Sequence, residues 1–150
     1  MPSHDPTHCR NQLATLVAGQ NAHLAALEGL LTQEYELLQT RDAEGLEKAG
    51  AARHECIGHI LRIEDERSKL CRAMGHADDA AGLHSLLAWC DPTGLLRPAL
   101  QEYGERTLRC REQNDRNGIL VNGRLQQEGR TYGPGNDESG GYGRKLTTRA

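Results

Sequence analysis

Metal binding is the first chemistry to consider in this sequence, because it contains seven histidines and five cysteines. His4, His8 and Cys9 lie near the N-terminus, and His54 and His59 lie five residues apart further along. Ligands on one helical face stand three or four residues apart, so the spacing of His54 and His59 does not suit a shared metal ion. The first group precedes any periodic pattern that could orient it. We therefore expect no metal ion, no cofactor and dispersed surface histidines.

Nucleophilic and acid–base catalysis are not indicated either. Glu64-Asp65-Glu66 is a run of carboxylates, but consecutive helical residues point in different directions, which predicts a solvated face. No glycine-rich phosphate loop, G-x-S-x-G motif or zincin motif is present. The five cysteines lie far apart and form no Cys-x-x-Cys pair, and such an odd, scattered set is typical of buried thiols in a reducing compartment: Cys9, Cys56, Cys71, Cys90 and Cys110. The sequence predicts a cytoplasmic protein that is not an enzyme.

Charge argues against nucleic acid and membranes as partners. The net charge is −3 at pH 7, and neither a membrane-spanning apolar run nor a signal-peptide core is present. Residues 95–150 hold 10 basic and 7 acidic side chains, whereas residues 1–94 hold 8 and 14. The arginines of the basic part alternate with acids and not with aromatics, which favours a salt-bridged helix surface over nucleic-acid binding: Arg106, Arg109, Arg111, Arg116, Arg124 and Arg130.

The elements that carry these residues are predicted to be helices. The chain has 21 Leu and 16 Ala, but only 6 Val plus Ile, no Phe and 3% aromatic residues. A β-sheet needs β-branched and aromatic side chains, whereas Leu, Ala, Glu, Gln and Arg are strong helix formers. The composition therefore predicts an all-α protein with leucine-lined seams and argues against a deep aromatic ligand pocket.

Apolar periodicity divides the chain into three long helices and one short one. Residues 1 to about 7 show no periodic pattern and are expected to be frayed. Asp42 is a candidate N-cap for the second helix, Asp78-Asp79 for the third, and Asp91-Pro92-Thr93-Gly94 is a turn signal before the fourth. The stripes of the first and fourth helices are Leu13, Val17, Leu24, Leu27, Leu31, Tyr35 and Leu38, then Leu96, Leu100, Tyr103, Thr107, Cys110, Asn114, Asn117 and Val121.

The second helix has a regular heptad from Leu46 to Met74. Arg53 and Arg67 occupy seam positions, and their heads are expected to reach water while their stems pack. We predict an elongated antiparallel bundle over residues 1–130 and a flexible, glycine-rich tail over residues 131–150. An alternative hypothesis is a structural coiled-coil or helical-bundle adaptor that oligomerises through this heptad, with Ile60 and Ile63 buried between chains.

The end of the fourth helix is the candidate binding region. Asn114 and Asn117 take seam positions, where asparagine lowers stability but can specify register. Gly118 weakens the helix locally. The apolar residues that follow are spread over a wider part of the helix surface than a single stripe: Ile119, Leu120, Val121 and Leu125. They either pack on the first two helices or remain partly exposed and bind a partner helix.

This region also carries a family resemblance. Asn114-Asp115-Arg116-Asn117-Gly118 resembles the N-x-x-N-G stretch of the FlgN family of flagellar export chaperones. Thr131-Tyr132-Gly133-Pro134-Gly135-Asn136 is similar to the tail pattern of that family, and Gly143-Arg144-Lys145-Leu146 to its basic ending. The restart from Asp42 to Leu46 and the single Trp89 are similar in order and spacing.

The resemblance implies a cytosolic, non-enzymatic chaperone of the flagellar type III secretion system. Its expected clients are the helical C-terminal segments of the hook–filament junction proteins FlgK and FlgL, which it would keep from premature assembly and deliver to the export gate. The client-binding region of the family corresponds to Asn114, Asn117, Gly118, Ile119, Leu120, Val121 and Leu125. Tyr132 corresponds to a contact for the export-gate protein FlhA.

Overall fold

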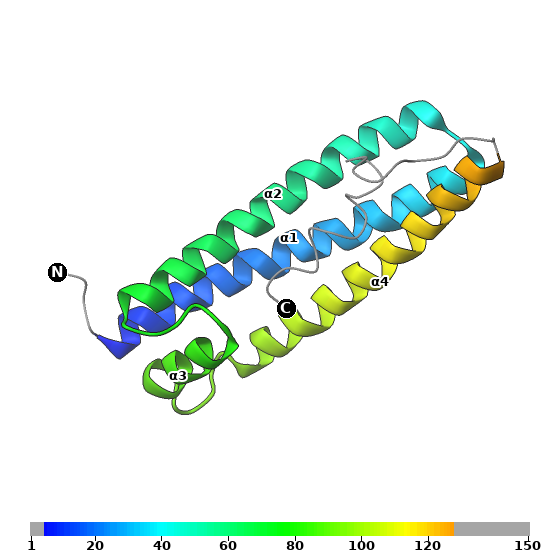
Figure 1. Cartoon of the computed structure of the whole chain (residues 1–150). Coiled ribbons are helices and arrows are strands. Elements are labelled where there is room, and N and C mark those ends of the chain that lie inside the picture. Colours follow the sequence, from blue (N-terminus) through cyan, green and yellow to red (C-terminus); the bar gives the residue numbers. More distant parts are fainter. Residues whose placement is uncertain (1–4, 128–150) are drawn as a thin grey trace.

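The computed structural model describes residues 5–127 of the 150-residue chain, and its side chains as far as residue 123. These residues form four helices and no strand: α1 (Pro6–Thr40), α2 (Ala43–Ala73), α3 (Ala80–Cys90) and α4 (Arg97–Gln127). The long helices lie side by side and alternate in direction, with α3 at the corner where α2 leads to α4 (Figure 1). The predicted all-α bundle of three long helices and one short helix is confirmed. The predicted tail at residues 131–150 lies outside the described residues.

Short polar caps set the helix boundaries much as the sequence predicts. The carboxylate of Asp42 accepts a hydrogen bond from the Gly45 N–H at 2.9 Å, and that of Asp79 accepts one from the Gly82 N–H at 2.8 Å. Asp91 precedes α4, and its two carboxylate oxygens accept the N–H groups of Leu95 and Leu96, each at 2.9 Å. Each of these carboxylates satisfies backbone donors that helix geometry leaves free.

The sequence predicted a frayed segment from residue 1 to about residue 7, but residues 6 and 7 are helical. α1 begins at Pro6, and the carboxylate of Asp5 accepts a hydrogen bond from the Thr7 N–H at 3.1 Å. Proline suits the first helical position because its missing N–H would have no helical partner there and its φ is already helical. Pro6 therefore marks the first residue of α1 and not an irregular segment.

α1 is the central element of the bundle. It packs against α2, α3 and α4, whereas no Cα atom of α2 lies within 8 Å of a Cα atom of α4 in the described part of the chain. Long side chains bridge the space between α2 and α4: the Tyr103 hydroxyl donates to Glu64 Oε1 at 3.3 Å, and the Arg67 guanidinium lies 5.1 Å from the centre of the Tyr103 ring. The burial of α1 between two long neighbours explains the width of its apolar face.

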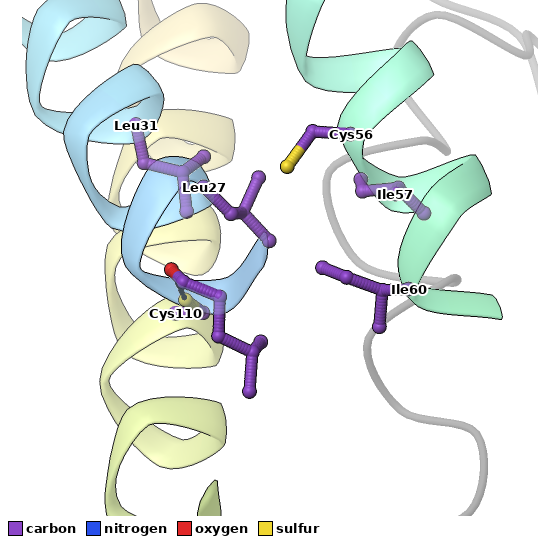
Figure 2. Packing of buried hydrophobic residues seen from close by; sticks show 7 residues of the cluster. Leu27, Leu31, Cys56, Ile57, Ile60 and Cys110 are labelled. Atoms are coloured by element: carbon purple, nitrogen blue, oxygen red, sulfur yellow. Dashed lines mark hydrogen bonds between the residues drawn. The ribbon is translucent and has the colours of Figure 1, made fainter. Parts of the chain in front are cut away.

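The core consists of two clusters along α1. The middle cluster brings together residues of α1, α2 and α4: Leu24, Leu27, Leu31, Cys56, Ile57, Ile60 and Cys110. Figure 2 shows Leu27 of α1 and Ile60 of α2 pointing toward one another. The corner cluster joins the start of α1 to α2, α3 and the start of α4: Cys9, Leu13, Val17, Cys71, Leu86, Cys90 and Leu96. All five cysteines are buried, as expected of core thiols. Ile60 is buried within its own chain, so the α2 heptad already serves the bundle.

Three polar side chains behave differently from the expectation. Arg53 is turned mainly into the bundle: its side chain is 13% exposed, and its Nε lies 2.8 Å from Oε1 of Glu34, whose side chain is 1% exposed. Arg67 donates to Gln20 Oε1 at 3.3 Å. Glu64 is buried and not part of a solvated face, although Asp65 beside it is exposed. In each case the side chain pairs with a polar or charged group on another helix, which periodicity alone does not reveal.

Gly82 provides a test of how closely α3 is packed. A Cβ atom at this position would overlap the backbone carbonyl of Ala77, whereas a Cβ at Gly104 on α4 would meet nothing. We expect Gly82→Ala to lower the free energy of unfolding by about 1–3 kcal/mol through steric overlap. The matched Gly104→Ala should raise it by about 0.5–1 kcal/mol through better helix propensity. Urea denaturation followed by circular dichroism measures both, and equal effects of the two changes would contradict the packing of α3.

Candidate functional site

The predicted client-binding residues fall on two different faces of α4. Asn114 and Asn117 lie on the inner face and are buried, with exposures of 1% and 0%. The side-chain Nδ2 of Asn117 donates to the Leu31 carbonyl of α1 at 2.9 Å. The Oδ1 atom of Asn114 accepts no hydrogen bond from the described residues. These two asparagines therefore belong to the seam between α1 and α4, where they are not available to a partner.

Polar contacts between α1 and α4 keep these helices in one register. Asn21 of α1 donates to the Ala99 carbonyl at 3.0 Å across a separation of 78 residues, and Asn117 pairs with Leu31 across 86. The Cys110 thiol donates to the Leu24 carbonyl at 3.6 Å, also across 86 residues. Because the paired residues of α1 and α4 keep a nearly constant separation in the sequence, the two helices run in the same direction. The predicted role of the asparagines in specifying register agrees with this geometry.

Arginines of α4 form ion pairs with α1, as predicted for a salt-bridged surface. Glu28 of α1 lies 3.2 Å from Arg106 and 3.3 Å from Arg109. The Arg116 guanidinium stacks 3.7 Å from the centre of the Tyr35 ring. Hydrogen bonding to Glu28 raises the pKa of Arg109. These arginines are engaged with the bundle and form no free basic stripe for nucleic acid among the described residues.

The outer face of α4 carries the part of the candidate site that is accessible. Ile119 is 73% exposed, and Gly118, Leu120 and Val121 beside it are half-buried. Leu125 lies within α4, but its side chain is outside the described part. Tyr132, the predicted export-gate contact, also lies outside the described residues. Of the predicted apolar residues whose side chains are described, the structure thus leaves Ile119 exposed, and Leu120 and Val121 only partly accessible.

Leu108 is an exposed apolar residue that the sequence analysis did not single out. Its exposed fraction is 55%, and it precedes Ile119 by eleven residues on the same helix. Eleven residues make about three helical turns, so both side chains lie on the same line of α4, roughly 16 Å apart. The sequence does hold a signal of this exposure: Leu108 lies between the seam residues Thr107 and Cys110, and a leucine at that position is off the apolar stripe.

The remaining candidates do not form a catalytic or metal site in the described residues. Burial raises the pKa of Cys110 and of Cys9 to about 12, so both are protonated thiols at neutral pH. His59 stacks on His23 of α1 with ring centroids 5.0 Å apart, which is closer association than dispersed surface histidines would show. Within residues 5–127, no group of three or more His, Cys, Asp or Glu side chains could hold a metal ion.

The structure therefore defines a helical-bundle protein, and the described candidate residues lie on its last helix. A family model described as FlgN protein matches residues 9–148, and the chain belongs to the FlgN family. This is a family of flagellar chaperones and not of enzymes, so membership indicates a role as a flagellar chaperone. Searches of curated proteins and of solved structures found no match. Among the described residues, no helix is long and apolar enough to cross a membrane.

The two faces of α4 should respond differently to substitution. Asn117→Ala removes the hydrogen bond to Leu31 and leaves a small cavity, so we expect a loss of about 1–2 kcal/mol in the free energy of unfolding. Ile119→Ala should change it by less than about 0.5 kcal/mol, because the side chain is exposed. Urea denaturation midpoints measure both. A large loss on Ile119→Ala would mean that this residue supports the bundle.

Proposed function

We propose that this protein is a cytoplasmic chaperone of the flagellar type III export system. Its clients are the hook–filament junction proteins FlgK and FlgL, which it keeps from premature assembly and targets to the export gate. Membership of the FlgN family supports the chaperone role. The exposure of two apolar side chains on the same side of α4, Leu108 and Ile119, is the observation that supports a client site on this helix.

The client contact in this proposal centres on Leu108 and Ile119, with Leu120 and Val121 at its edge. An amphipathic client helix presents apolar side chains at intervals of three or four residues. Three turns of such a helix are about 16 Å long, which is also the distance along α4 from Leu108 to Ile119. Asp115 and Glu112 are exposed on α4 between these two positions. They lie on the same side of α4 as Leu108 and Ile119, so they can pair with basic side chains of a bound helix, which favours one orientation over another.

Asn114 and Asn117 have a positioning role in this proposal. Their side chains are buried, and the bond from Asn117 to Leu31 holds α4 against α1. Gly118 follows directly and lowers local helix stability. The apolar end of α4 can therefore adjust to a client while the seam before it stays fixed. The family resemblance adds Leu125, four residues after Val121 in the sequence, to the proposed contact.

The client site is tested by removing exposed side chains from α4. Leu108→Ala and Ile119→Ala together should weaken binding of FlgK and FlgL C-terminal segments by at least about tenfold, because exposed apolar anchors carry much of the affinity in a helix groove. Isothermal titration calorimetry with purified segments measures the change. Leu95→Ala is the matched control, since Leu95 is 62% exposed but lies before α4 begins.

Truncation after Gly118 is the second test of this site. It should leave most helicity intact but abolish capture of the clients. Undiminished client binding by the truncated chain, or an equal loss caused by Leu95→Ala, would contradict the placement of the site on α4.

The export-gate contact is assigned in this proposal to Tyr132. Tyr132→Ala should leave client binding unchanged and weaken binding to the cytoplasmic part of FlhA, because the family resemblance places the gate contact in the tail. Surface plasmon resonance with immobilised FlhA measures the second effect. Tyr142→Phe serves as a conservative control in the same tail. Loss of both activities on Tyr132→Ala would make the tail part of the client site.

A further inference from the structure

The outer face of α4 carries two acidic side chains between its two exposed apolar ones. Glu112 and Asp115 are exposed and form no ion pair in the described part of the chain. Taken from Ile119 back to Leu108, this face therefore presents an apolar, an acidic, a second acidic and a second apolar side chain. A complementary partner carries two cationic side chains between two apolar ones.

The arginines of α4 do not neutralise these carboxylates. Arg109 lies 3.3 Å from Glu28 of α1, and the Arg116 guanidinium stacks on the Tyr35 ring of α1. Both guanidinium groups are thus engaged at the contact between α4 and α1. The two carboxylates on the outer face remain available to a basic partner.

The C-terminal segment of this chain has the complementary pattern. Residues 142–150 contain the apolar side chains Tyr142 and Leu146, with Arg144 and Lys145 between them, and no acidic residue. The residues that connect α4 to this segment do not match, because they include three acidic residues and one basic residue. The segment lies outside the described residues of the structure.

The length of chain beyond α4 allows this segment to reach the outer face. α4 ends at Gln127, and Tyr142 follows fifteen residues later. Such a connection spans at most about 50 Å, whereas Ile119 lies roughly 12 Å back along α4 from Gln127. Four extended residues, the separation of Tyr142 from Leu146, cover about 13 Å. The two exposed apolar side chains of α4 are a similar distance apart, roughly 16 Å.

We propose that, in the absence of a client, residues 142–150 dock on the outer face of α4 in the same chain. The segment runs opposite to α4, so that Tyr142 covers Ile119 and Leu146 covers Leu108. The two basic side chains between them pair with the two carboxylates of α4. Exposed ion pairs are individually weak, but attachment to α4 raises the effective concentration of the segment to about the millimolar range.

Docking makes the C-terminal segment a competitor of clients for the same surface. A client binds only to the fraction of molecules from which the segment is displaced, so its apparent affinity is lowered by that fraction. Binding of a client in turn releases the segment. This consequence rests on the proposed function, whereas docking itself requires no client.

A zero-length carbodiimide cross-linker tests the docking in the full-length chain without a client. It joins a lysine amine to a carboxylate in contact with it, so peptide mapping of the monomer should find Lys145 linked to Glu112 or Asp115. Lys69 lies 3.0 Å from Asp65 on α2, and their link is the internal positive control.

A substitution that leaves the reacting groups in place shows whether the contact is specific. Leu146→Ala should lower the yield of the Lys145 link at least about threefold, because it removes an apolar contact and spares the amine and the carboxylates. Thr147→Ala is the matched control and should leave the yield unchanged. The docking would be overturned by a Lys145 link mainly to other carboxylates, by links to α4 only between two chains, or by no effect of Leu146→Ala.

The competition is measured separately, by calorimetric titration of the full-length chain with client segments. Arg144→Glu should tighten client binding at least about threefold, because it weakens the docked state, and Arg130→Glu is the control. If the cross-link forms but Arg144→Glu leaves client affinity unchanged, the client site does not lie on the outer face of α4. That result would contradict the competition and the proposed client site, while the docking would stand.

Discussion

The packing of every helix on α1 is the constraint on which the rest of this structure depends. α2 and α4 do not approach each other through their backbones in the described residues, so α1 must bury two opposite faces at once. A helix in this position cannot confine its polar residues to one exposed side. Gln20, Asn21 and Glu34 of α1 are consequently buried, and each contacts a group on a neighbouring helix. These contacts are the specific interactions that join the long helices.

The buried polar contacts confer specificity more than stability. Leucine seams between helices tolerate shifts by one heptad, because the same kind of side chain then meets the same kind of groove. A displaced α4 would separate Asn117 from the Leu31 carbonyl and would separate Glu28 from Arg106. A displaced α2 would leave Glu34 without Arg53 in a site that is nearly inaccessible to water. Such alternatives are penalised by desolvated polar groups, so one register is preferred.

Much of the fold could be predicted from the sequence, because helix caps and apolar periodicity are local signals. Asp42, Asp79 and the turn at Asp91 marked the helix boundaries, and the stripes identified the buried leucines. Long-range pairing could not be predicted in the same way. Arg53 in a seam looked like a side chain that extends to water, since its partner Glu34 lies on another helix. Leu108 was missed for a related reason: exposure of a single leucine depends on how far α4 is rotated about its own axis, which only the packed structure determines.

That rotation connects the seam to the surface proposed for clients. Successive residues of an α-helix are about 100° apart, so a slip of one position would carry Ile119 from solvent toward α1 and bring Gly118 outward. Asn117 prevents this slip because its bond to Leu31 can form at only one rotation of α4. The stretch that resembles the FlgN pattern, Asn114 to Gly118, therefore need not touch a client to be required for binding one. Its buried asparagines orient α4, and this orientation turns the line that carries Leu108 and Ile119 toward solvent.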